Sequence, residues 1–146
     1  MRVLGLDVGD RRIGIAMSDS LGLTAQRLTV LERRGPEADV TALCALITQH
    51  NVDALVVGLP LTMRGIRGIQ AEKVSAFIER VRRRTSVPVH WVDERLTTVQ
   101  GTRALQETGR ARRPKGTIDQ VAAQLILQQF LDTRLTPAAP DEPVTS

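Results

Sequence analysis

The sequence is poor in cysteine and in aromatic residues, and it has no long apolar stretch. A single cysteine among 146 residues excludes an intrachain disulfide. No stretch approaches the ~20 apolar residues of a membrane-spanning helix, and the start, MRVLGLD, lacks the basic region and apolar core of a secretory signal. Two Phe, one Trp and no Tyr leave few platforms for stacking against nucleobases. These absences favour a soluble, cytoplasmic protein.

Arginine dominates the charge. Twenty basic residues face sixteen acidic ones, for a net charge of +4, and eighteen of the twenty are arginine. The last eleven residues hold two acids and no base, so residues 1–135 carry +6. The planar arginine fork suits phosphate, which indicates a polyanionic partner. A GC-rich genome would also favour arginine, although it would not explain the clusters ERVRRRTS and GRARRPKGT.

The length suits one domain, and the apolar pattern predicts a mixed α/β sheet. We expect a domain over residues 1–135 and a disordered tail over 136–146. A hairpin followed by alternating strands and helices predicts a sheet that is antiparallel at its start and parallel later. The expected strands cover 2–8, 13–19, 24–32, 52–60 and 87–93, and the expected helices cover 36–50, 69–84, 97–109 and 117–134.

An acidic residue, Asp7, interrupts the apolar first strand. A buried carboxylate is costly unless something compensates it. Gly5 and Gly9 are expected to leave room above the strand for an ion and its waters. Oxygen ligands favour Mg²⁺ or Mn²⁺, and neither histidine has zinc-type spacing. The residues by themselves thus predict a candidate metal site around Asp7.

Further acids lie where they could join Asp7. Asp93 and Glu94 end the last strand, and strand parity turns them to opposite faces, so only one should take part. Asp119 lies in the first turn of the last helix, where small neighbours, Ala122 and Ala123, let the helix approach the sheet. Each acid also has a purely structural interpretation: Asp119 as a helix cap, and Asp93 and Glu94 as solvated loop residues.

Four stretches together resemble the YqgF/RuvX family. They are GLDVGDRRIGIAMSD (5–19), VVGLPLTMRG (56–65), VDERLTT (92–98) and IDQVAAQLILQQFL (118–131), and the resemblance spans residues 1 to about 133 in order. Members of this family are described as Holliday junction resolvases and as nucleases that mature the end of precursor 16S ribosomal RNA. The resemblance implies a ribonuclease H-like, five-stranded mixed sheet flanked by helices.

The resemblance also implies the chemistry. Asp7, Glu94 and Asp119 would be the catalytic acids and would hold two Mg²⁺ or Mn²⁺ ions, with Asp93 in a supporting role. The products would carry a 5′-phosphate and a 3′-hydroxyl. Basic residues beside these acids would bind the nucleic acid, namely Arg11, Arg12, Arg95, Arg110, Arg112, Arg113 and Lys115. The bases at 80–84 are instead interpreted as a solvated helix surface.

The chain departs from the family in one loop and leaves other functions open. Thr62 and Arg64 stand where the family commonly has Asn and an acidic or amide residue, which puts substrate contacts of that loop in doubt. One alternative is a non-catalytic RNA-binding factor of ribosome assembly. Another is an actin-like nucleotide-binding enzyme, although such enzymes clamp nucleotide between two domains. Resolving a four-way junction would require two active sites and therefore a homodimer.

Overall fold

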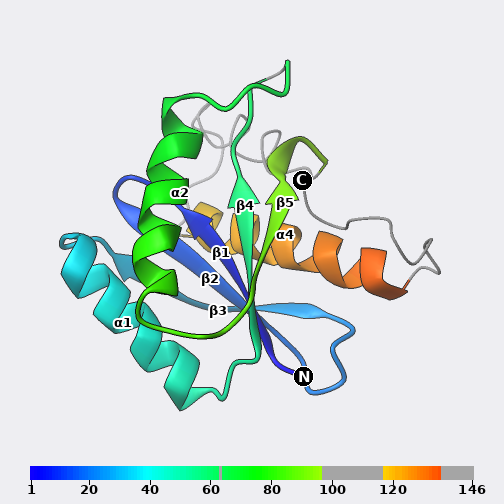
Figure 1. The fold of residues 1–146 in the computed structure, drawn as a ribbon. Coiled ribbons are helices and arrows are strands. Elements are labelled where there is room, and N and C mark those ends of the chain that lie inside the picture. Colours follow the sequence, from blue (N-terminus) through cyan, green and yellow to red (C-terminus); the bar gives the residue numbers. More distant parts are fainter. Residues whose placement is uncertain (63, 97–116, 136–146) are drawn as a thin grey trace.

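One five-stranded sheet forms the centre of the protein (Figure 1). The computed structural model describes residues 1–62, 64–96 and 117–135. The strand order is β3-β2-β1-β4-β5; β1, β2 and β3 pair antiparallel, whereas β1-β4 and β4-β5 pair parallel. This arrangement confirms the predicted mixed sheet. The strands are β1 (Val3–Val8), β2 (Arg12–Ser18), β3 (Ala25–Glu32), β4 (Ala54–Leu59) and β5 (Val89–Asp93).

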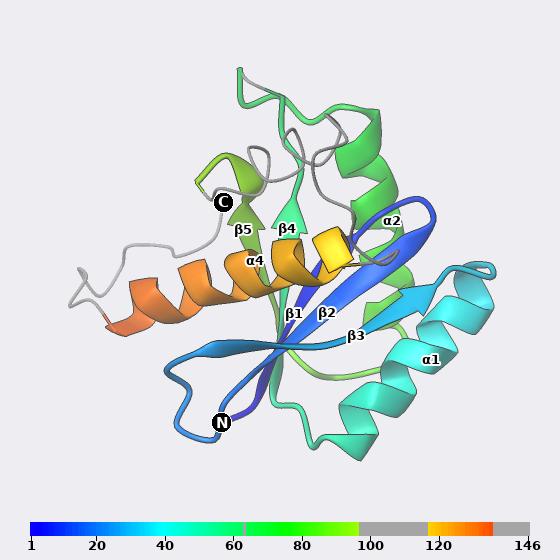
Figure 2. The same ribbon diagram turned by 180° about the vertical axis from the view of Figure 1, so that it is seen from behind.

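Helices cover both faces of the sheet. Two of them, α1 (Pro36–Gln49) and α2 (Ile69–Arg82), lie on one face, and α4 (Thr117–Leu135) crosses the other (Figures 1 and 2). A short 3₁₀ turn, η1 (Glu94–Leu96), follows β5. The predicted helix over 97–109 and the predicted tail over 136–146 lie outside the described residues.

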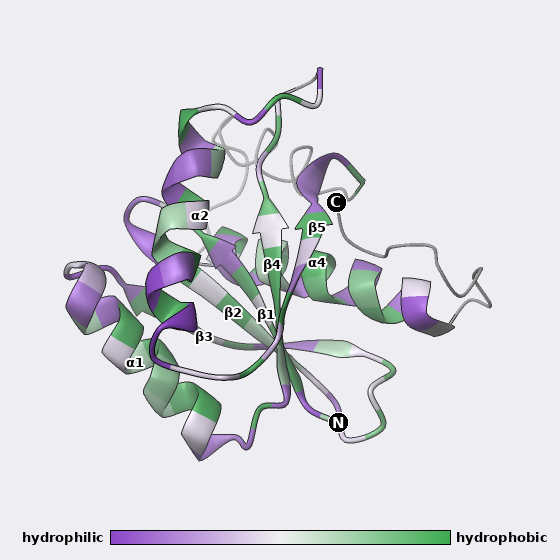
Figure 3. Ribbon diagram, viewed as in Figure 1, coloured by the Kyte–Doolittle hydropathy of each residue, from purple (hydrophilic) through white to green (hydrophobic). Residues whose placement is uncertain are grey.

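Alternation along the strands divides the core into two apolar clusters. In β1, Leu4 and Leu6 pack on the α1/α2 side, and Val3 packs on the α4 side. Cys44 of α1 is partly buried and packs against the first cluster. In Figure 3 the middle of the sheet is mostly apolar, and polar residues are concentrated on α2 and in the loops. By the same alternation, Asp7 faces α4.

Helix α4 lies unusually close to β1 and β2. A Cβ atom on Gly5 would come within 2.6 Å of the Leu127 Cβ and 2.9 Å of the Ala123 carbonyl oxygen, so only glycine fits there. Polar contacts set the direction of the helix across the sheet. The Gln128 side chain accepts a hydrogen bond from the Ala25 N–H (2.8 Å), and the Gln124 side chain donates one to the Ala25 carbonyl (2.9 Å).

Asp39 ties the start of α1 to the end of β3. Its side chain is 3% exposed and accepts hydrogen bonds from the Arg33 guanidinium (3.0 Å) and the Arg34 N–H (2.9 Å). Arg33 also donates to the Gly9 carbonyl (2.9 Å) and lies over the Phe77 ring. This one carboxylate therefore orders a junction of the β1–β2 turn, α1 and α2.

We predict that Asp39→Asn removes an acid-sensitive part of the stability. Burial raises the pKa of Asp39, but the hydrogen bonds from Arg34 and Arg33 outweigh it and hold the pKa below its ordinary value. The stabilisation is therefore complete above about pH 4 and is lost as the pH falls through the lowered folded pKa. Urea unfolding should show the variant about 1–3 kcal/mol less stable than the wild type at pH 7, and this difference in the free energy of unfolding should shrink toward pH 2. A difference that does not change with pH would contradict this.

Candidate active site

Asp7 lies between two glycines in a row across the sheet. It is 2% exposed, and its partner in β2 is Gly14. On the other side Leu6 pairs with Val57 of β4, and the next pair in this parallel register places Gly58 beside Asp7. The central carboxylate therefore has no side chain on either flank in the neighbouring strands.

The space above each glycine holds one of the other predicted acids. A Cβ atom on Gly14 would press against the Asp119 carbonyl group and lie 2.9 Å from the Asp119 Cβ. A Cβ atom on Gly58 would lie 3.0 Å from Oε1 of Glu94 and 2.5 Å from Cδ1 of Ile126. Asp119 and Glu94 thus approach Asp7 from opposite sides, on the α4 face of the sheet.

Glu94 and Asp93 turn to opposite faces, as strand parity predicts. Val92 pairs with Gly58 and packs in the cluster on the α4 side, so Asp93 points away from α4 and Glu94 returns toward it. Glu94 is 3% exposed and Asp93 is 6% exposed. Asp93 forms an ion pair with Arg95 (2.6 Å), and the hydrogen bond from that side chain lowers the pKa of Asp93.

The prediction that Gly5 and Gly9 leave room for an ion is wrong. The space above Gly5 is filled by Leu127 and Ala123 of α4, and a Cβ atom on Gly9 would lie 2.9 Å from the Arg12 carbonyl oxygen. These two glycines serve close packing and a tight turn. The glycines that make space beside Asp7 are its cross-strand neighbours.

Sequence analysis missed Gly14 and Gly58 as parts of the site. Each is an isolated glycine within an apolar strand, RIGIA or LVVGL. Such a glycine often marks a close approach of another backbone or a ligand. That signal was present, but the strand register was needed to show that both glycines flank Asp7.

The basic residues named from the sequence have different surroundings. Arg11 is exposed, Arg12 forms an ion pair with Glu32 (2.9 Å), and Arg95 pairs with Asp93. Arg110, Arg112, Arg113 and Lys115 lie outside the described residues. The predicted solvated surface at the end of α2 is confirmed, because the bases at 80–84 are exposed and three of them form surface ion pairs.

The three acids offer carboxylate oxygens, which suit Mg²⁺ or Mn²⁺. Within residues 1–62, 64–96 and 117–135, no three or more His, Cys, Asp or Glu side chains are placed to hold a metal ion together. Asp7 instead has one acid on each side, Asp119 above Gly14 and Glu94 above Gly58. Asp7 and Glu94 are both buried, and a bound cation would relieve the repulsion between such carboxylates. In their donor chemistry, the three acids therefore suit divalent ions.

The strand order and the helices on both faces define a ribonuclease H-like fold. Solved structures share this fold: *Thermus thermophilus* RuvC in complex with a Holliday junction (TM-score 0.61, 20% identity, 96% of this chain and 99% of that chain) and the fowlpox virus resolvase with junction DNA (TM-score 0.53, 13% identity, 93% and 100%). The chain belongs to the RuvX family, described as "Holliday junction resolvase", which matches residues 1–133.

Curated relatives from two organisms match almost the whole chain. A *Moorella thermoacetica* protein is 51% identical over 133 residues, which cover 90% of this chain and 95% of the relative. A *Synechococcus elongatus* protein is 45% identical over 135 residues, which cover 92% and 91%. Both are named "Putative pre-16S rRNA nuclease".

Among the described residues, none of the helices combines the length and the apolar character that a membrane span requires.

We predict that Gly14→Ala destabilises the protein by forcing the first turn of α4 away from β2. The added methyl group would meet the Asp119 backbone, and such overpacking costs about 1–3 kcal/mol. Gly68→Ala is the matched control, because its Cβ meets only Thr62 at 3.7 Å and should cost under about 1 kcal/mol. Urea unfolding measures both. Equal stability of the two variants would show that α4 does not pack on Gly14.

Proposed function

We propose that this protein is a metal-dependent endonuclease that hydrolyses phosphodiester bonds in structured nucleic acid. The observation that carries the proposal is the row of Asp7 between Gly14 and Gly58, with Asp119 and Glu94 above the two glycines. Membership in the RuvX family and the names of close relatives support the same activity.

Each acid has a distinct part in the proposed site. Asp7, on the central strand, would hold both ions, and Glu94 and Asp119 would each contribute oxygen ligands from one side of it. Two divalent ions, when bound, would lower the pKa of the attacking water and neutralise charge on the phosphate and the leaving oxygen. The protein's contribution is to hold the three carboxylates on rigid elements: a central strand, the turn after β5 and the first turn of α4.

We propose the 5′ end of precursor 16S ribosomal RNA as the leading substrate. Relatives at 51% and 45% identity are named as nucleases of pre-16S rRNA, whereas the resolvase structures, at 20% identity or less, support the fold alone. Holliday junction DNA is the second candidate, and its resolution would require a homodimer. Scarce aromatic residues favour recognition of phosphates and shape over base identity. Either substrate implies action in the cytoplasm.

We predict that Asp7→Asn abolishes Mg²⁺- or Mn²⁺-dependent cleavage and leaves the fold intact or slightly stabilised. The neutral amide removes the shared ligand and relieves repulsion among the acids. Cleavage should be measured on precursor ribosomal RNA, single-stranded RNA, flap DNA and junction DNA with each ion. Asp10→Asn is the matched control, because this nearby carboxylate is exposed and pairs with Lys73.

Full activity of Asp7→Asn would overturn the site assignment. Metal-independent cleavage would overturn the proposed mechanism. A wild type that binds precursor RNA but cleaves none of the four substrates would favour the non-catalytic assembly factor.

We predict that Arg112→Gln/Arg113→Gln weakens nucleic-acid binding and flattens its salt dependence. Removing two phosphate contacts should reduce the slope of log affinity against log salt by up to about two. Arg82→Gln/Arg83→Gln removes the same charge from the end of α2 and serves as the control. Fluorescence anisotropy at several salt concentrations measures the slope. An unchanged slope would show that Arg112 and Arg113 do not contact phosphate and that the nucleic acid binds at another surface.

A further inference from the structure

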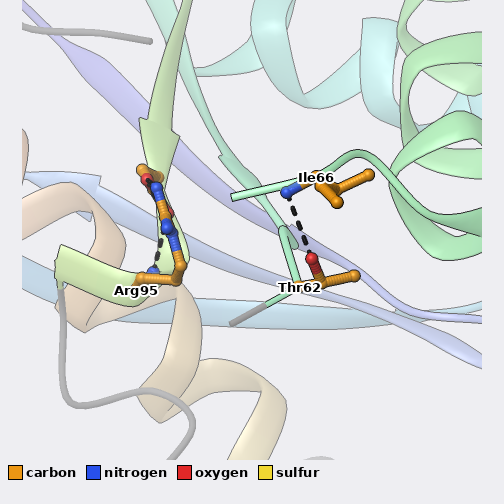
Figure 4. Close-up of polar contacts among 4 residues, drawn as sticks. Thr62, Ile66 and Arg95 are labelled. Carbon is orange, nitrogen blue, oxygen red and sulfur yellow. Dashed lines mark hydrogen bonds and ion pairs between the residues drawn. The ribbon is translucent and has the colours of Figure 1, made fainter. Parts of the chain in front are cut away.

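Arg95 is held by an ion pair and hydrogen bonds to Asp93, and Glu94 lies between these two residues in the sequence. The Asp93 carboxylate accepts hydrogen bonds from the Arg95 backbone N–H (2.9 Å), from Nε (3.1 Å to each oxygen) and from Nη2 (2.6 Å). Figure 4 shows Arg95 beside the loop that carries Thr62 and Ile66. The hydrogen bonds between Asp93 and Arg95 therefore close the turn that carries Glu94.

The neighbouring loop, which leads from β4 to α2, is closed by its own hydrogen bonds. Leu61 and Arg67 form an isolated β-bridge. The Ile66 N–H donates to the Thr62 hydroxyl (3.1 Å), the contact marked in Figure 4, and the Gly65 N–H donates to the Thr62 carbonyl (2.8 Å). Thr62, a departure from the family pattern, therefore has a structural role in this chain.

Arg95 packs directly against this loop at Gly65. A Cβ atom on Gly65 would lie 2.9 Å from Nη1, 3.2 Å from Nη2 and 3.3 Å from Cζ of Arg95. The backbone of Gly65 has φ +78°, which also disfavours any other residue. The guanidinium thus lies between the Asp93 carboxylate and the loop backbone.

We propose that Arg95 is a positioning residue that couples the Leu61–Arg67 loop to the catalytic carboxylate of Glu94. Its Nε and Nη2 donors bond to Asp93 and its guanidinium packs on Gly65, so in this proposal it acts through the backbone of the turn rather than by contact with phosphate. This revises the role expected from the sequence and rests on the proposed nuclease function. A shift of the loop moves Arg95, and with it the turn that holds Glu94 over Gly58.

Three variants separate positioning from phosphate binding. Arg95→Lys keeps the charge but loses the planar fork, and Arg95→Gln loses both. Gly65→Ala displaces the guanidinium and strains the loop backbone without changing any charge. We expect each to lower kcat by about 10–100-fold, the range seen when groups that orient metal ligands are removed. KM and the salt slope of binding should stay at wild-type values. Arg82→Gln, which removes an exposed arginine paired with Glu79, should leave kcat unchanged.

The double variant tests the coupling itself. If Gly65 and Arg95 act through one contact, Arg95→Gln/Gly65→Ala should be no slower than Arg95→Gln alone. Multiplying effects would overturn the proposal. It would also be overturned if Arg95→Lys restored wild-type kcat, or if Arg95→Gln raised KM and reduced the salt slope by about one, because those results describe a phosphate contact.

A spectroscopic readout keeps the proposal separate from the nuclease assignment. In nuclear magnetic resonance spectra the Arg95 Nε–H should exchange slowly in the wild type, and Gly65→Ala should speed that exchange and shift the Glu94 amide signal. An unchanged Glu94 amide would overturn the coupling whether or not the protein cleaves. A wild type without cleavage would instead refute the proposed function, and the spectra alone would then decide the coupling.

Discussion

The burial of one carboxylate in the central strand constrains the rest of this structure. A charged group that is 2% exposed costs several kcal/mol unless its surroundings compensate it. Glycines on both neighbouring strands keep the space beside Asp7 clear of side chains, and two distant segments bring acids into that space. Asp119 on α4 and Glu94 in the turn after β5 supply those acids. The same arrangement gives a set of oxygen donors on rigid supports.

Close packing and polar contacts together fix the position of α4. Gly5 and Gly14 admit the helix, and Gln124 and Gln128 attach it to the start of β3. Asp119 is therefore placed beside Gly14 by the close contact between its own backbone and that glycine. Several of the described arginines form ion pairs with acids near the end of the sheet where Asp7 lies, namely Arg12, Arg33 and Arg95. Phosphate binding in the proposed nuclease then depends on the remaining basic residues.

Much of the architecture was predictable because the local patterns are strong. The alternation of β1 and β2, the continuous apolar run of β4 and the start of α1 at Pro36 all agree with the structure. Asp7 stood out because it breaks an apolar strand, and parity assigned Glu94 and Asp93 to opposite faces. The glycines were misjudged, because a glycine in sequence does not reveal whether its space is open or filled by another segment.

Local periodicity and residue chemistry were enough to predict the described elements, their order, the faces of the strands and the candidate acids. The folded chain was needed to show that Gly14 and Gly58 flank Asp7, that α4 fills the space above Gly5, and that Arg95 packs on Gly65. Those facts depend on strand register and on contacts between segments far apart in the chain. No local pattern encodes such distances, because they arise from the packing of the whole molecule.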